Sequence, residues 1–147
     1  MLSATLDANI LVYASDQASP LHRQAQGLVE QFAAGPELGY LFWPVLIGYL
    51  RLVTHPAIFA RPLSLAIAAA NVDDLLHRPH VRVPSEGEDF WTIAAAALRE
   101  VSATGNLVSD AHLVALMRAS GVSSIWTQDR DLRKFDGIRV RDPFTDH

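Results

Sequence analysis

The stretch Leu6-Asp7-Ala8-Asn9-Ile10 decides the fold of this 147-residue chain. The apolar, β-branched lead-in of residues 4–6 predicts a short buried strand, and the apolar run of residues 10–14 predicts a helix directly after it. Asp7 therefore falls where a strand turns into a helix. In an α/β sheet, ligands bind at the carboxyl ends of the strands. We expect Asp7 to be a functional carboxylate at such an end.

Turn and capping signals divide the rest of the chain into alternating strands and helices. The predicted strands are residues 4–6, 38–42, 81–83, 123–127 and 138–140. The predicted helices lie between them, at residues 10–14, 21–32, 44–54, 65–76, 90–101 and 107–119, with Ser19, Ser64 and Asn106 as N-caps. This alternation predicts an α/β fold with a central parallel sheet and helices on both faces. Residues 1–147 are expected to form one domain.

Composition excludes several classes of protein. The chain has no cysteine, so disulfides and thiolate zinc sites are excluded and a cytoplasmic protein is expected. The amino terminus lacks a basic region, and Asp7 interrupts its apolar run, so no signal peptide is predicted. The longest charge-free run, residues 38–50, is too short to span a membrane. The net charge of −4 argues against a protein that coats nucleic acid, although a nuclease site built of carboxylates is itself acidic.

Three aspartates far apart in sequence share one kind of place. Asp7 follows the first predicted strand, Asp129 follows the fourth, and Asp110 is expected in the first turn of the helix that begins near Asn106. Strand ends and the starts of the following helices lie at the same edge of a parallel sheet, so the three carboxylates are expected to converge. Converging carboxylates repel one another unless a cation lies between them. Mg²⁺ and Mn²⁺ prefer such all-oxygen ligands, and they activate water for attack on phosphodiesters.

Each aspartate also has a simpler interpretation. Asp110 near a helix start is compatible with a role in stabilising the helix dipole. Asp129 and Asp131, within Gln128-Asp129-Arg130-Asp131, are typical turn formers. Asp7 is harder to explain in this way, because it interrupts an apolar run at the end of a strand. The coincidence of all three favours a metal site.

The motifs around these aspartates resemble those of a known family. Leu6-Asp7-Ala8-Asn9, residues 105–113 (GNLVSDAHL) and residues 127–132 (TQDRDL) are similar to the three acidic motifs of PIN-domain proteins, and most closely to VapC toxins of bacterial type II toxin–antitoxin systems. Residues 48–56 and 135–138 resemble the linking segments of that family as well. The resemblance covers essentially the whole chain, in order.

The resemblance implies a three-layer α/β/α PIN-like fold and an endoribonuclease that requires Mg²⁺ or Mn²⁺. Asp7, Asp110 and Asp129 would be the catalytic and metal-binding carboxylates, with Asp131 as an additional metal ligand or a turn cap. Asn9 and Thr127 would hold metal-bound waters or orient the aspartates, with turn capping as the alternative. The substrate would be RNA, and a VapB-type antitoxin would cover the acidic pocket.

One residue departs from the pattern of the family. Many PIN domains carry a glutamate on the third helix, roughly where this chain has Gly48, and the neighbouring residues supply no carboxylate. This leaves open whether the site holds one metal or two. It also keeps open a second interpretation, a weak or inert PIN-like module that binds RNA or protein. A third, a receiver-like phosphoryl-transfer domain with Asp7 as nucleophile, is disfavoured because the only lysine, Lys134, follows the last acidic turn.

Several other side chains have less specific roles. His112 lies about 200° around its helix from Asp110 and is expected to pack or bond elsewhere. His55 is expected to end a helix, and Arg51 is a candidate for phosphate or partner contact or a solvated residue. A basic segment beside Asp129 would hold an RNA backbone or form a solvated face: Arg130, Arg133, Lys134, Arg139 and Arg141. The excess apolar surface of residues 42–52 predicts a homodimer or an antitoxin-binding surface.

Overall fold

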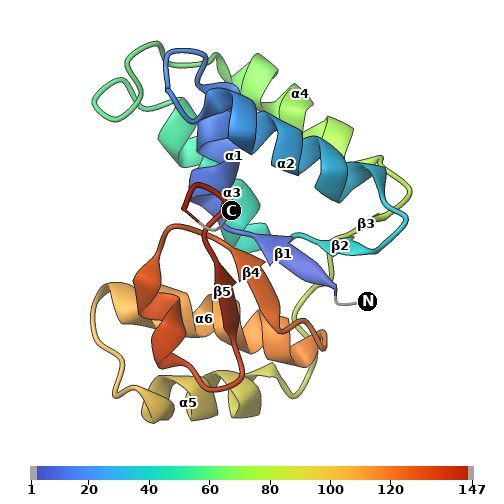
Figure 1. The fold of residues 1–147 in the computed structure, drawn as a ribbon. Coiled ribbons are helices and arrows are strands. Elements are labelled where there is room, and N and C mark those ends of the chain that lie inside the picture. The colour runs from blue at the N-terminus through green and yellow to red at the C-terminus, as the bar shows by residue number, and fades with distance from the viewer. Residues whose placement is uncertain (1–2, 146–147) are drawn as a thin grey trace.

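A five-stranded parallel sheet forms the centre of the protein in a computed structural model that describes residues 3–145 (Figure 1). The strands lie in the order β3-β2-β1-β4-β5, and every neighbouring pair is parallel. Their bounds are β1 Ala4–Leu6, β2 Gly39–Tyr40, β3 Val81–Arg82, β4 Ser124–Trp126 and β5 Arg139–Arg141. The predicted parallel sheet is therefore confirmed, and β1 lies at its centre.

Helices cover both faces of this sheet. Figure 1 shows α1, α2 and α4 on one side and α5 and α6 on the other, while α3 packs against α1 and α4. Their bounds are α1 Ala8–Ser15, α2 His22–Ala34, α3 Trp43–Val53, α4 Leu65–Leu76, α5 Phe90–Glu100 and α6 Asn106–Ala119. The three-layer α/β/α arrangement predicted from the sequence is confirmed.

Most predicted elements exist, but several bounds were wrong. The strands predicted at residues 38–42 and 123–127 are shorter, because the structure pairs only Gly39–Tyr40 and Ser124–Trp126 in ladders. The turn after β4 continues into a 3-10 helix, η1 (Arg130–Lys134), which the sequence did not predict. The shortening places Thr127 and the following residues outside the sheet, at its carboxyl edge.

The three predicted helix caps had different outcomes. The Ser64 hydroxyl accepts a hydrogen bond from the amide of Ile67 at 3.2 Å and caps α4 as expected. Ser19 is not the cap of α2, because residues 20 and 21 form a turn before the helix starts at His22. Asn106 is the first residue of α6, and the cap is Gly105 with a left-handed φ of 57°. Asp110 is consequently the fifth residue of α6, so the prediction that it lies in the first turn was wrong.

The core lies between the sheet and its two helical layers. Leu6, Ile10, Phe42 and Ile125 are completely buried in it, so the elements that meet at the carboxyl edge near Asp7 are held by apolar packing on both sides of the sheet. Among the helices of residues 3–145, none has the length and apolar character needed to cross a membrane.

Candidate metal site

Asp7 lies at the carboxyl end of β1, as the sequence predicts. Its backbone amide continues the ladder to the carbonyl of Trp126 at 3.0 Å, and its carboxylate then caps α1 by accepting the amide of Ala8 at 2.7 Å. Burial raises the pKa of Asp7, although hydrogen bonds from Thr127 and Ala8 oppose that shift. The charge of Asp129 raises this pKa further. Asp7 is therefore a partly buried carboxylate in a negative field.

The hydroxyl of Thr127 connects Asp7 to the end of β4. This fully buried hydroxyl donates a hydrogen bond to Oδ2 of Asp7 at 2.7 Å. It accepts one from Nδ2 of Asn9 at 3.2 Å and one from the backbone amide of Asp129 at 2.9 Å. Of the roles considered for Asn9 and Thr127, these contacts favour orientation of the aspartates.

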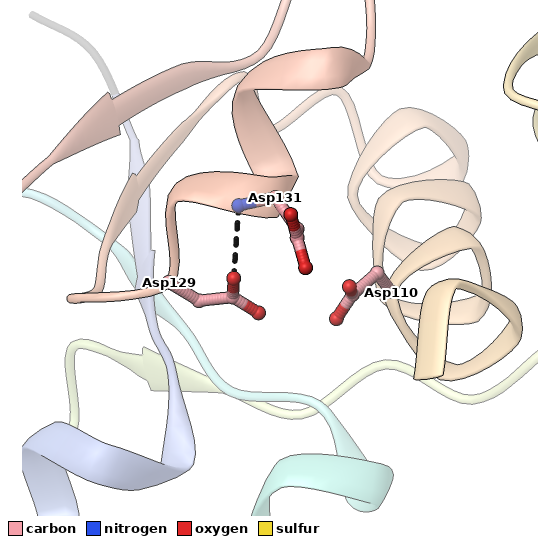
Figure 2. Close-up of side chains that lie close together, drawn as sticks. All are labelled: Asp110, Asp129 and Asp131. Carbon is pink, nitrogen blue, oxygen red and sulfur yellow. Dashed lines mark hydrogen bonds between the residues drawn. The ribbon is translucent and has the colours of Figure 1, made fainter. Parts of the chain in front are cut away.

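Asp110, Asp129 and Asp131 form an acidic cluster beside Asp7. Each offers a carboxylate oxygen, and these three oxygens lie within 4.8 Å of one another. Figure 2 shows the three carboxylates pointing toward a common space, with Asp110 coming from α6 and the other two from the start of η1. The amide of Asp131 donates to Oδ1 of Asp129 at 2.9 Å, which fixes the turn.

The carboxylates of the cluster repel one another, so the charged form of Asp110 is less favourable than in water. Burial is the largest cause and acts with the charges of Asp129, Asp7 and Asp131 to raise the pKa of Asp110 to about 7. A hydrogen bond between the carboxyl groups of Asp110 and Asp129 acts in the same direction. Lys134 lies 3.2 Å from Asp131 and offsets part of the charge there, but both side chains are about half exposed, so this ion pair stabilises little. A divalent cation would relieve the repulsion, and three carboxylates are a donor set that suits Mg²⁺ or Mn²⁺.

Asp7 stands slightly apart from these three carboxylates. It is not one of the residues whose oxygens lie within 4.8 Å of one another. Its two oxygens instead accept hydrogen bonds from the amide of Ala8 and the hydroxyl of Thr127. Its charge nevertheless contributes to the raised pKa of Asp110. The structure thus brings the four predicted acidic residues to one edge, with Asp7 behind the other three.

Gly48 leaves open space next to this edge. A Cβ at Gly48 would meet only the Cβ of Ala8, at 3.9 Å, which is ordinary van der Waals contact. Ala8 directly follows Asp7 and is the first residue of α1. At this point of α3 the chain therefore has room for a Cβ but carries no carboxylate.

The other candidate side chains lie away from the acidic cluster or on its border. His112 bonds to Glu86 at 2.6 Å, as expected for a side chain that faces away from Asp110, although the sequence did not predict this partner. The amide of Ala57 donates to Nδ1 of His55, beyond the end of α3. Arg51 is exposed in the last turn of that helix. None of these three contacts a predicted metal ligand among the described residues.

The predicted basic segment divides between two places. Arg130, Arg133 and Lys134 are exposed on η1, beside the acidic cluster. Arg141 instead lies on β5, where its guanidinium stacks over the ring of Trp126 at 4.1 Å. Sequence reasoning missed this stacking, which depends on the register between β4 and β5.

Comparisons with known proteins agree with this fold. A PIN domain model matches residues 4–138. Ribonuclease VapC48 of Mycobacterium tuberculosis is 51% identical over 144 residues, which cover 98% of this chain and 99% of the relative. The crystal structure of VapC20 from M. tuberculosis, a toxin that cleaves the sarcin–ricin loop, superimposes with a TM-score of 0.64 at 22% identity, covering 92% of this chain and 98% of that one. VapBC2 from Rickettsia felis, bound to a promoter DNA fragment, gives a TM-score of 0.64 at 14% identity, with 95% and 98% covered.

The hydroxyl of Thr127 allows a test against a matched threonine. Thr127→Val keeps the shape of the side chain but leaves Asp7, Asn9 and the amide of Asp129 without their shared partner, so we expect a loss of ~1–3 kcal/mol in the free energy of unfolding. Thr5 on β1 is equally buried, and its hydroxyl has no partner among the described residues, so Thr5→Val should be neutral or stabilising. Urea denaturation of both variants measures this difference. Equal losses would mean that the hydroxyl of Thr127 has no special role.

Because the pKa of Asp110 is raised in the fold, the stability of the metal-free protein should change with pH in a definite direction. Because this pKa is about 7 in the fold and its ordinary value is 3.8, the folded protein holds a proton that the unfolded chain releases. The metal-free protein should therefore lose stability as pH rises between these two values. Asp110→Asn should remove that loss and raise the melting temperature in EDTA at roughly pH 8, by about 4 °C for each kcal/mol relieved. Thermal scans across this range would contradict the account if parent and variant changed in parallel.

Proposed function

Because this chain belongs to the PIN-domain family and, within it, to the VapC ribonucleases, we propose that it is a metal-dependent endoribonuclease whose site is the acidic edge formed by Asp7, Asp110, Asp129 and Asp131. The observation that carries the proposal is the acidic cluster itself, whose three carboxylate oxygens lie within 4.8 Å of one another. The family match across residues 4–138 supports treating residues 1–147 as one domain.

Each residue of the edge has a definite task in this proposal. Asp110, Asp129 and Asp131 would hold Mg²⁺ or Mn²⁺. The charge of Asp7 would add to the negative potential at the ion. The ion, when bound, supplies an activated water and stabilises charge on the phosphodiester. Thr127 orients Asp7 and the amide of Asp129, and the exposed Asp131 leaves the cluster open to an RNA backbone. Asp110 must lose its proton before it can bind the cation, so metal binding should release a proton near neutral pH.

The alternative is a weak or inert PIN-like module that binds RNA or protein. Gly48 is the observation that favours it, because many PIN domains carry a glutamate roughly at this position and this chain has none there. Against it stands the acidic cluster, in which the charges of Asp129, Asp7 and Asp131 raise the pKa of Asp110. Three converging carboxylates repel one another, and a bound cation would offset that repulsion.

Two protein partners are part of the proposal. An antitoxin of the VapB type is supported by the likeness of this fold to VapBC2. A homodimer is supported by α3, where Trp43 and Ile47 are 42% and 58% exposed one helical turn apart. Apolar side chains at this spacing form one stripe, which a second copy of the chain would cover.

Cleavage of RNA tests the proposed activity. The purified protein should cut a structured RNA in Mg²⁺ or Mn²⁺, and EDTA should abolish cutting. Asp129→Asn should reduce the rate by at least about 100-fold, or ~2.7 kcal/mol, because it removes a charge that holds the ion. The control is Asp73→Asn, an exposed aspartate of α4 outside the acidic cluster. Cutting that persists in EDTA would contradict the metal-dependent mechanism, and RNA binding without any cutting would favour the inert module.

The stripe on α3 predicts the oligomeric state. Sedimentation of the parent should give the mass of a dimer, and Ile47→Glu should give the monomer, because it places a charge in the apolar contact. Ile67→Glu is the matched control, since Ile67 is similarly exposed, at 55%, but lies on α4. A monomeric parent, or a dimer unaffected by Ile47→Glu, would rule out this interface.

A further inference from the structure

A groove runs between α2 and the strands β4 and β5, on the face of the sheet opposite α6. One part of it has a volume of about 310 Å³ and is lined by Arg23, Gln24, Gly27 and Gln31 of α2, by Trp126 of β4 and by Pro143. A second hollow of about 270 Å³ follows it. The two share Leu28, Gln31 and Trp126 in their walls, so they adjoin along the helix.

The wall formed by α2 carries polar side chains beside the apolar Leu28 and Phe32, and it has a gap at Gly27. Arg23, Gly27 and Gln31 are spaced four residues apart, so they lie on one face of the helix. A glycine inside an exposed helix destabilises it by about 1 kcal/mol relative to alanine. A Cβ at Gly27 would meet nothing within 4 Å, so packing inside the protein does not require this glycine. Its position suits a ligand that must approach the helix closely.

The opposite wall presents an aromatic ring and a cation together. Trp126 and Arg141 are partners in the ladder between β4 and β5, and the guanidinium of Arg141 lies 4.1 Å from the centre of the indole ring. Trp126 is only partly buried, and Arg141 and Arg23 are exposed. Planar guanidinium groups and aromatic rings stack on nucleic-acid bases, while arginine also binds phosphate.

The two strands that line this groove end beside Thr127, at the edge of the sheet that carries the acidic cluster. The carbonyl of Arg141 accepts a hydrogen bond from the amide of Thr127 at 3.0 Å, and Trp126 directly precedes Thr127. A strand of nucleic acid that crosses this edge would continue over Trp126 and Arg141, at the ends of the two strands that line the groove.

We propose that the groove between α2 and the β4–β5 strands binds a single-stranded segment of the RNA substrate next to the cleaved phosphodiester, with Arg23 and Arg141 on its phosphates and the Trp126–Arg141 pair beneath a base. This inference rests on the proposed ribonuclease function and adds a substrate-binding surface outside the carboxylate site.

Charge favours RNA as the occupant. The chain carries a net charge of −4, yet two exposed arginines flank this groove close to the acidic edge. Acidic groups are also present, because Glu37 lines the far hollow and Asp142 follows Arg141. The RNA is therefore placed over the hollow lined by Arg23, Gln24 and Trp126, and over the adjoining guanidinium of Arg141, which stacks on Trp126 and lines the second hollow.

Binding to RNA in EDTA tests the groove without cleavage. The probe is a fluorescent single strand of about twelve nucleotides, a length within the usual range for such sites. Arg23→Gln and Arg141→Gln should each weaken binding several-fold and lower the salt dependence of log K by about 0.7, the value for one lost phosphate contact on a single strand. Gly27→Leu should weaken RNA binding to a similar degree, because its side chain would fill the gap in the wall of α2. This substitution leaves the net charge of the protein unchanged.

The control is Arg99→Gln, which removes an exposed arginine from α5 on the other side of the sheet. Arg23 lies on an exposed helical face, so its variant tests the groove even if Arg141→Gln perturbs β5.

If Arg23→Gln and Gly27→Leu bind RNA as Arg99→Gln does, the inference is overturned. Loss of antitoxin binding with RNA binding intact would also overturn it, since the groove would then be a protein site. Failure of the parent to cut RNA in Mg²⁺ would instead count against the proposed function.

Discussion

The structure of the site depends on one buried hydroxyl. Thr127 joins the ends of two neighbouring parallel strands, because it donates to the carboxylate of Asp7 after β1 and accepts the amide of Asp129 after β4. The pairing of Leu6 with Trp126 places these groups side by side. The apolar core thus sets the register of the strands, and the register places the carboxylates.

The carboxylates of the acidic edge are held close together by the fold although they repel one another. Backbone amides donate to the carboxylates of Asp7 and Asp129, which cap α1 and η1. Asp110 comes from the second turn of α6, and its pKa is raised by the neighbouring charges as well as by burial. A bound cation would offset this repulsion and so would stabilise the folded protein.

The sequence predicted the parallel sheet, and it predicted that the acidic residues meet at one edge of that sheet. Both predictions were possible because strand periodicity is a local pattern and the topology of parallel sheets follows general rules. The sequence-based prediction misplaced the start of α6, since the left-handed Gly105 supplies the cap in place of the side chain of Asn106. The contacts of Thr127, the space at Gly48 and the stacking of Arg141 on Trp126 depend on distances between segments far apart in the chain. No spacing pattern encodes those distances.

The most direct test of the central claim is calorimetric titration of the parent with Mg²⁺ or Mn²⁺, beside its Asp7→Asn and Asp110→Asn variants. The account predicts one binding event in the parent that weakens sharply in both variants, because two aspartates 103 positions apart in sequence then act on one ion. Binding that persists unchanged in either variant, with all three proteins folded alike, would contradict it. An absence of binding to the parent at millimolar metal would move the inert-module interpretation ahead.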